Sequence, residues 1–253
     1  MYNILISTVL AILVFALLAF GLHLFWWLSL IIAILLMAGT FILISRIIMK
    51  RIEVVMSSAM KDIQTQRTNS KEMQVKLVEK AISEMQGALK YSKWQIYVGG
   101  QINSSIGMLY YIKRDFANAF PYLQKGFFKN WITMGMLAVT YMKKNKKDKM
   151  RATFDRAVIG SPKESLIWAL YAFCLTSSNE KERAIEILNK GLKKLPGDEK
   201  LADNLELLKD GKKMKMTDYG EMWYQFHLES PGTIQKQQMA AMTGGMKRKV
   251  VRR

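Results

Sequence analysis

Few side chains in this sequence could carry out chemistry. The chain has two His and one Cys, too few to assemble a zinc or iron-sulfur site or an internal disulfide. It contains no glycine-rich phosphate loop and no His near a Ser or Cys nucleophile in the sequence. The single thiol, Cys174, stands in an apolar run and is typical of a small buried side chain. We therefore expect no enzymatic activity, no metal and no cofactor.

The charges begin only after residue 45. The chain of 253 residues carries 38 Lys and Arg against 20 Asp and Glu, a net charge of +18, but no Lys, Arg, Asp or Glu precedes Arg46, and His23 is the only His there. A bilayer core needs roughly 20 apolar residues in a helix, and this uncharged run is about twice that length. We expect residues 1–45 to form a transmembrane helical hairpin, with spans at 4–22 and 24–44 and a break at 21–23.

Two other interpretations of this run stay open. A cleaved signal peptide is one, although no Lys or Arg precedes Arg46. A single tilted or re-entrant segment is the other. His23 could act as a proton relay inside the membrane or simply mark the hydrated turn of the hairpin. Beside it stand Phe25, Trp26 and Trp27, which suit a membrane interface.

Basic residues predict the orientation of the hairpin. Arg46, Lys50 and Arg51 follow the second span, and no Lys or Arg precedes it. Because basic residues of short loops stay on the cytoplasmic side, we expect an integral protein of the cytoplasmic membrane with its soluble domain and both termini in the cytoplasm. An unpaired thiol agrees with a reducing compartment.

Residues 46–98 have the pattern of juxtamembrane and leading amphipathic helices. A helical stripe continues from the second span, at Ile48, Ile52, Val55, Ala59 and Ile63. It could pair with a second copy, but we expect it to rest on its own domain or on the membrane surface. After a break at 68–70, a second helix from Lys71 should stop at Gly99 and Gly100, with one face formed by Val78, Ile82, Met85 and Leu89.

An internal repeat with a period of 34 residues follows. Small, large and proline positions recur in matching order, as in the pairs Met134 and Trp168, Leu137 and Tyr171, Ala138 and Ala172, Met150 and Ala184, Phe154 and Leu188, Ala157 and Gly191, and Pro162 and Pro196. An earlier unit begins at Gly100, and it is about three residues short before Trp131. A repeat of this length is typical of stacked helix pairs.

These residues resemble the tetratricopeptide repeat, a helix-turn-helix unit of 34 residues. The small and Tyr positions of its first helix are matched by Gly107 and Tyr110 and by Ala138 and Tyr141, whereas Leu175 replaces Tyr after Ala172. The match runs from Gly100 to Gly197, and the first unit lacks the terminal proline. The expected fold is all-α, with the transmembrane hairpin followed over residues 99–213 by a tetratricopeptide-like α-solenoid of about three repeats and a polar capping helix at 200–210.

The resemblance implies a concave groove that binds a protein partner. The inner positions of the first helices are Ser104, Met108, Ile132, Met136, Val139 and Phe173. They carry no positive charge, so a clamp for a terminal carboxylate is not supported and an apolar or aromatic ligand fits better. The alternative is that some of these side chains belong to the core between repeats.

Residues 214–253 form an aromatic and Met-rich segment and a basic tail. The segment contains Met214, Met216, Tyr219, Met222, Trp223, Tyr224 and Phe226. We expect it to pack on the last repeat, with recognition of a partner or of the membrane interface as the alternative. It is also a candidate occupant of the groove.

Basic residues gather in two places that could meet anionic lipid head groups. One is an inter-helix turn with Lys143, Lys144, Lys146, Lys147 and Lys149, and the other is the tail with Lys247, Arg248, Lys249, Arg252 and Arg253. We expect a membrane-anchored adaptor or scaffold that binds a protein partner at the cytoplasmic face. The alternatives are a membrane-surface nucleic-acid or ribosome-binding protein, motivated by the charge, and an accessory subunit of a membrane machine.

Overall fold

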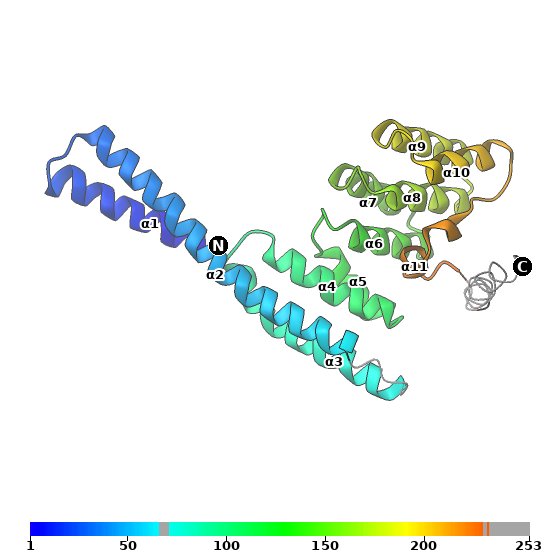
Figure 1. Cartoon of the computed structure of the whole chain (residues 1–253), viewed down its shortest axis with the longest axis horizontal. Coiled ribbons are helices and arrows are strands. Elements are labelled where there is room, and N and C mark those ends of the chain that lie inside the picture. Colours follow the sequence, from blue (N-terminus) through cyan, green and yellow to red (C-terminus); the bar gives the residue numbers. More distant parts are fainter. Residues whose placement is uncertain (66–70, 230–231, 233–253) are drawn as a thin grey trace, which may run out of the picture. The chain divides into compact units, whose positions relative to one another are not determined.

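A computed structural model describes residues 1–65, 71–229 and 232. Within these residues the chain is helical and forms no strand (Figure 1). It divides into two compact units, Met1–Thr133 and Met134–Arg253, and each is described by itself. The expectation of an all-α chain with two apolar helices at its N-terminus is confirmed.

The first unit begins with a helical hairpin. Helix α1 (Tyr2–Ala16) continues into a π-helical turn, η1 (Leu17–Gly21), and α2 (Trp26–Thr65) runs back beside α1 (Figure 1). Tyr2–Gly21 and Trp26–Ser58 are long and apolar enough to cross a membrane. The break lies where the sequence predicts it, although α2 starts two residues later than expected.

The hairpin buries small and polar groups and exposes its large apolar ones. Leu13 and Leu35 are 62% and 67% exposed, whereas Asn3, Ser7 and Ser29 are buried. The Asn3 amide donates to Ser45 Oγ at 2.8 Å, close to the open end of the hairpin. Small and polar residues between helices, with apolar ones outside, are the arrangement that lipid favours.

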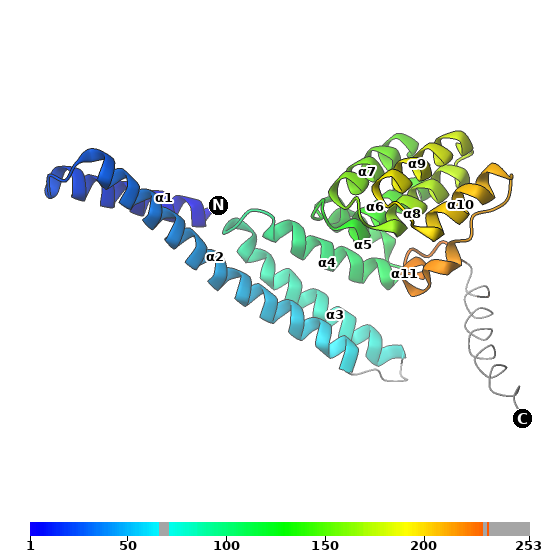
Figure 2. The ribbon, with the colours of Figure 1, turned by 45° about the horizontal axis from the view of Figure 1, so that its top comes forward.

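Beyond residue 45, α2 packs against its own unit. Ile48 and Ile52 are buried in a core with residues of α3 (Lys71–Ala88) and α4 (Val98–Ile112), including Ala81, Ile82, Met85, Val98 and Ile102. Figure 2 shows α2 and α3 side by side. The expectation that this stripe rests on its own domain is confirmed for Ile48 and Ile52. The side chains of Ala59 and Ile63, and residues 68–70, lie outside the description.

The helix that follows Lys71 ends earlier than the sequence predicts. It stops at Ala88, a 3-10 helix η2 covers Leu89–Lys93, and α4 begins at Val98. Gly99 and Gly100 therefore open a helix and do not end one. A Cβ on Gly99 would lie 2.9 Å from Ser92 Cβ and one on Gly100 3.3 Å from Phe127 Cα, so both glycines permit close backbone approach.

A run of helices follows in the part of the chain that the structure describes. After α4 and α5 (Phe116–Gln124) come α6 (Trp131–Lys143), α7 (Lys147–Gly160), α8 (Ser165–Ser177) and α9 (Lys181–Lys194). The start and end of α8 and α9 each follow those of α6 and α7 by 34 residues, and both pairs contain helices of 13 and 14 residues. The period found in the sequence is therefore also the period of the helices.

The turn inside each pair has the same backbone structure. Arg114, Asn145 and Asn179 adopt positive φ angles of 66°, 54° and 64°. Each is followed by a residue whose N–H bonds back to the carbonyl five residues earlier, as in Asp115 to Tyr110, Lys146 to Tyr141 and Glu180 to Leu175. Such bonds satisfy carbonyl groups at the end of a helix.

Several pairs of residues related by the 34-residue period share their burial. Phe154 and Leu188 are fully buried, and so are Ala138 and Ala172. Phe154 stacks on Tyr171 with 4.7 Å between ring centroids. A Cβ on Gly191 would lie 3.0 Å from Trp168 Cγ, so this small position allows the aromatic ring to approach the helix.

Helix α10 (Glu199–Lys209) occupies the expected place of the capping helix. Its first turn is capped by Asp198, which accepts from Leu201 N at 2.9 Å. Leu201, Leu205 and Leu208 are buried on one face. Asn204 is buried too, and its side chain accepts a hydrogen bond from Lys215 N in the segment that follows.

Candidate functional site

The aromatic segment of residues 214–229 packs against the first helices of both pairs in the second unit. It contains a 3-10 helix, η3 (Met216–Tyr219), and a short helix, α11 (Glu221–Tyr224). Trp223 and Phe226 are fully buried. The Trp223 ring meets Phe173 of α8 edge-on at 4.8 Å, and a Cβ on Gly135 of α6 would lie 2.9 Å from Phe226 Cε1.

The expectation that the segment packs on the last repeat is confirmed by its contacts with Phe173 and Ser165 of α8. The contact with α6 was not predicted. Gly135 allows this contact, because without a side chain it leaves space for the Phe226 ring. Gly135 stands in an apolar run of α6, and nothing in that run indicates that Phe226 would fill the space beside it.

Polar bonds hold the segment at several points. Lys215 N donates to Asn204 Oδ1 at 2.7 Å, Lys143 Nζ donates to the His227 carbonyl at 3.2 Å, and the Trp223 indole donates to Glu229 at 3.2 Å. Tyr219 OH lies 3.1 Å from Ser165 Oγ. Burial raises the pKa of Tyr219 well above its ordinary value, so its hydroxyl stays protonated.

The six groove candidates divide between the two units. In the first unit, Ser104 is buried and its hydroxyl accepts from Phe127 N at 2.8 Å, whereas Met108 and Ile132 are partly exposed. In the second unit, Met136 and Val139 are fully buried and Phe173 is partly exposed. A ligand can reach Met108, Ile132 and Phe173 without any side chain moving.

An open pocket of about 670 Å³ lies beside Phe173. Its wall combines Phe173 and Met214 with three lysines, Lys181, Lys212 and Lys213. Lys212 pairs with Asp210 at 3.0 Å. Glu229 of the aromatic segment also lines the pocket. The arrangement suits a ligand with both apolar and acidic groups.

Sequence reasoning did not assign these three lysines to a site. Lys212 and Lys213 follow shortly after α10, and this neighbouring pair of lysines was the only sequence signal that could have indicated the site. Lys181 stands at the start of α9, a full repeat away from the basic turn. Only the fold of the segment brings the three lysines to one pocket.

The lysines of the basic turn are all exposed. Lys147 Nζ donates to the Ser178 carbonyl at 2.9 Å, and Lys143 bonds to the aromatic segment, as described above. Lys144, Lys146 and Lys149 complete the group. Nearby, Arg151 bonds both carboxylate oxygens of Glu180 at 2.9 Å. The basic tail, Lys247, Arg248, Lys249, Arg252 and Arg253, lies outside the described residues.

Reactive groups do not gather in the described part of the chain. No group of three or more His, Cys, Asp or Glu there could hold a metal ion. Cys174 is buried, and burial raises the pKa of its thiol far above the ordinary value, which disfavours the nucleophilic thiolate.

Comparison with known proteins gives no relative to set beside this geometry. No family model, curated protein or solved structure matches the chain.

Proposed function

We propose that this chain is a membrane-anchored helical-repeat adaptor or scaffold that binds a protein partner at the cytoplasmic face of the membrane. The observation that carries the proposal is the pocket beside Phe173, which joins an aromatic ring to three lysines on a stack of helix pairs. Such a pocket offers an apolar anchor and a charge for a peptide segment.

The arrangement of the repeats is proposed to be a tetratricopeptide-like α-solenoid. Support comes from the 34-residue offset of α8 and α9 from α6 and α7. The shared positive φ angles of Arg114, Asn145 and Asn179 point the same way. In a solenoid the first helices line a concave surface, and the contacts of the aromatic segment with α6 and α8 are consistent with a binding face on these two helices.

The cytoplasmic placement rests on charge. Arg46, Lys50 and Arg51 follow the apolar part of α2, and the hairpin turn carries no Lys or Arg. The positive-inside tendency therefore favours both termini in the cytoplasm and an inner-membrane location. Outside the membrane, the repeat domain would present its pocket to cytoplasmic proteins.

A charge-reversal pair tests the partner site. The full chain is crosslinked in its native membrane, solubilised and purified, and bound proteins are quantified. Lys181→Glu with Lys213→Glu should reduce the recovery of a specific partner about tenfold or more, because each reversed charge now repels an acidic segment. The matched control, Lys190→Glu with Lys193→Glu, changes two exposed lysines of α9 outside the pocket.

Two results would contradict the proposal. One is equal recovery of every bound protein with both variants, provided that helicity and melting temperature are unchanged. The other is that the wild-type chain yields no more protein than residues 1–65 alone.

Nucleic-acid or ribosome binding is the second candidate. It is favoured by the exposed lysines of the basic turn, Lys143, Lys144, Lys146, Lys147 and Lys149, and by the net charge of +18. Binding of this kind weakens steeply with salt. RNA recovered with the crosslinked chain, and lost when these lysines are replaced by Gln, would favour it over the adaptor.

A further inference from the structure

The open end of the hairpin is joined to the loop after η2. Asn3 N donates to the Trp94 carbonyl at 3.2 Å, and the rings of Tyr2 and Trp94 meet edge-on at 5.6 Å. Asn3 also bonds to Ser45. If α1 and α2 span a bilayer, these contacts place Trp94 at the membrane surface.

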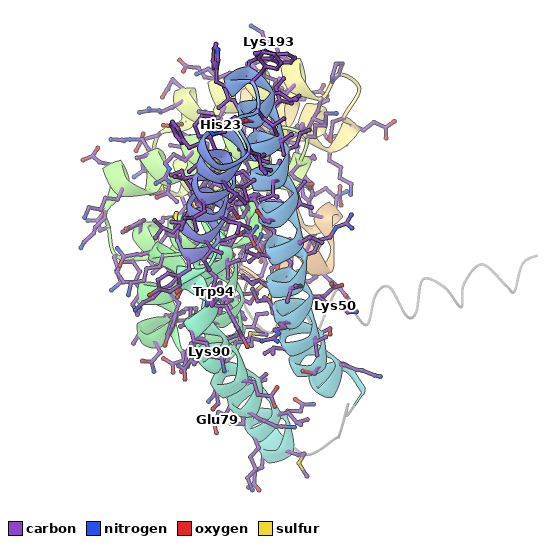
Figure 3. All side chains as sticks on the ribbon, turned by 90° about the vertical axis from the view of Figure 1, so that its left-hand side faces the viewer. His23, Lys50, Glu79, Lys90, Trp94 and Lys193 are labelled. Carbon is purple, nitrogen blue, oxygen red and sulfur yellow. The ribbon has the colours of Figure 1, made fainter. Side chains whose placement is uncertain are left out.

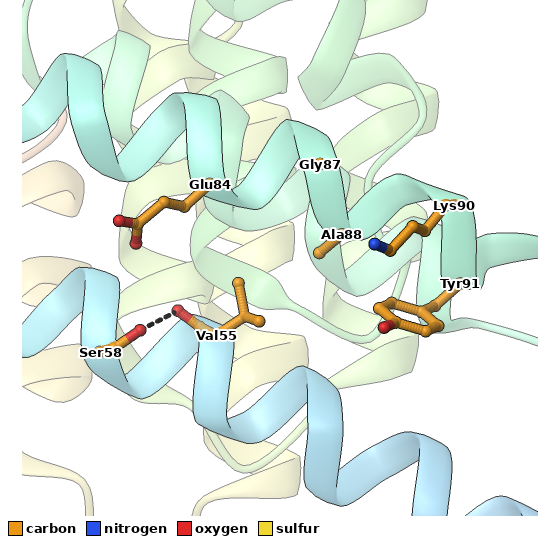
Figure 4. A pocket seen from close by; sticks show the side chains of 7 residues that line it. All are labelled: Val55, Ser58, Glu84, Gly87, Ala88, Lys90 and Tyr91. Carbon is orange, nitrogen blue, oxygen red and sulfur yellow. Dashed lines mark hydrogen bonds between the residues drawn. The ribbon is translucent and has the colours of Figure 1, made fainter.

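Three adjoining hollows run along α2 from this point. The first, of about 270 Å³, is lined by Ile44, Ile47, Arg51, Tyr91 and Trp94 among others. The second, of about 450 Å³, shares Ile47, Arg51 and Tyr91 and adds Lys50 and Val54. The third, of about 320 Å³, shares Tyr91 (Figure 4). We call them together the α2 groove.

Polarity changes along the α2 groove. Its first part is apolar, with Ile44, Ile47 and Trp94. Its middle carries the positive charges of Lys50 and Arg51. Figure 3 shows Lys50 on α2 and Lys90 with Trp94 on the neighbouring chain segment. In the third hollow Lys90 lies 5.3 Å from the Tyr91 ring centroid.

The acidic groups near the groove are few. Glu84 lines the third hollow and lies 3.8 Å from Lys80 Nζ, so a cation already faces it. No Asp or Glu lines the first or second hollow. An anion bound at Lys50 and Arg51 therefore meets no carboxylate there.

The depth of these groups matches the layers of a bilayer. With a rise of 1.5 Å per residue, Arg51 lies about 9 Å beyond Ser45 along α2. The polar layer on each side of a bilayer core is roughly 5 to 8 Å thick. Ile44 and Ile47 then border the acyl chains, Lys50 lies in the head-group layer and Arg51 lies at its outer edge. Ile47, which is 57% exposed, gains apolar cover at its depth.

We propose that the α2 groove binds an anionic glycerophospholipid. Its phosphate is held by Lys50 and Arg51, with Lys90 beside Tyr91 at the outer end, and its acyl chain lies against Ile44, Ile47 and Trp94. The proposal goes beyond partner binding and rests only on the membrane insertion included in the proposed function. The bound lipid would fix the first unit to the membrane surface.

Spin-label measurements of lipid selectivity test the groove. The full chain is reconstituted in phosphatidylcholine bilayers with trace spin-labelled phosphatidylglycerol or spin-labelled phosphatidylcholine. The ratio of their motionally restricted fractions gives the preference for the anionic lipid. We expect a preference for phosphatidylglycerol that falls about fivefold or more in Lys50→Gln with Arg51→Gln, because each cation near a surface contributes about fivefold.

Two further variants make the result specific. Arg51→Lys retains the charge and should retain the preference. Lys76→Gln with Lys125→Gln removes two exposed charges of the same unit outside the groove and should leave the preference within about twofold of the wild type. Circular dichroism establishes that every variant is folded.

The outcomes separate this proposal from the proposed function. If alkaline carbonate releases the wild-type chain from membranes, the anchoring is wrong and the groove proposal falls with it. If the chain stays inserted but shows no preference, or if the control variant loses as much preference as the groove variant, only the groove proposal is overturned. A protein occupant would leave the lipid preference of the purified chain unchanged by Lys50→Gln with Arg51→Gln.

Discussion

Helices α1 and α8 are both strongly apolar, yet their side chains meet different surroundings. In α1, Leu5 and Leu13 are 59% and 62% exposed, and the buried residues are Asn3, Ser7 and Ala11. In α8, nine of 13 residues are buried, among them Trp168, Leu170 and Tyr171. The same kind of composition thus forms an exposed surface in one region and a protein core in the other.

Length is the physical difference between the two regions. The first candidate span covers 20 residues, about 30 Å at 1.5 Å per residue, which equals the thickness of a bilayer core. Helix α8, with 13 residues, reaches only about 20 Å. An apolar helix that is too short to span must be covered by protein, and α9 and the aromatic segment provide this cover.

The largest expected effect is a charge placed in the core around α8. Phe154→Asp removes a ring that is fully buried and stacked on Tyr171 at 4.7 Å, and it buries an unpaired carboxylate. The loss of about 4 kcal/mol or more should unfold the helix pairs. Thermal unfolding by circular dichroism in detergent measures it. Ile159→Asp on the same helix is the control: Ile159 is 80% exposed, so its change should stay within about 0.5 kcal/mol.

Next in size is a charge on the lipid-facing surface of the hairpin. Leu35→Arg places a guanidinium at a position that is 67% exposed near the middle of the second span, and it should cost about 2.5 to 3.5 kcal/mol of insertion. The melting of the repeat helices should not change. Carbonate extraction measures insertion, with Leu35→Phe as the matched control. If the Leu35→Arg variant unfolds, or if it inserts as well as the wild type, the surface of the hairpin does not differ from the core around α8 in the way proposed.

A smaller effect is expected where the aromatic segment covers α6. Gly135→Leu places a side chain against Phe226 and Leu170, whose nearest atoms would lie 2.9 and 3.0 Å from the new Cβ. Overpacking of this kind costs about 1 to 3 kcal/mol and should expose residues 216–226 to hydrogen exchange. Gly87→Leu is the control, since nothing lies within 4 Å of its Cβ position. Unchanged exchange in Gly135→Leu would mean that the segment has another support.

Periodic features could be predicted from the sequence. The uncharged run gave the hairpin and its break, and the 34-residue period gave the positions of α6 to α9. Each of these two patterns extends over many residues, so one atypical residue does not change the prediction. A helix at about 200–210 was predicted from its place after Pro196 and Gly197, and α10 covers Glu199–Lys209.

Single close contacts could not be predicted. Gly99 and Gly100 were interpreted as a helix end, although their role is to let the chain approach Ser92 and Phe127. The burial of Asn204, which accepts a hydrogen bond from Lys215 N, was not predicted either. The pocket at Phe173 depends on the path of residues 211–214 around α10. Each of these features depends on contacts with residues elsewhere in the chain. Such contacts leave no periodic pattern in the sequence.

The smallest expected effect concerns helix caps, one in each unit. Asp115 Oδ1 accepts from Asn118 N at 3.2 Å at the start of α5, and Asp198 accepts from Leu201 N at the start of α10. Either residue changed to Ala should cost about 1 kcal/mol. Hydrogen exchange of the first turn of α5 or α10 locates each effect in its own unit.

The cap at Asp115 should also depend on pH. Bonds from the side chain and the backbone of Asn118 lower the pKa of the Asp115 carboxyl below its ordinary value. A lowered pKa in the folded state stabilises the fold above the unfolded pKa of about 3.9, and the contribution disappears as the pH falls through the folded value. The protection of α5 should therefore decrease below about pH 4 in the wild type. Asp115→Asn keeps an acceptor for the backbone N–H but cannot titrate, so its protection should fall less over the same interval. An equal decrease in both proteins would assign the acid sensitivity of α5 to another group.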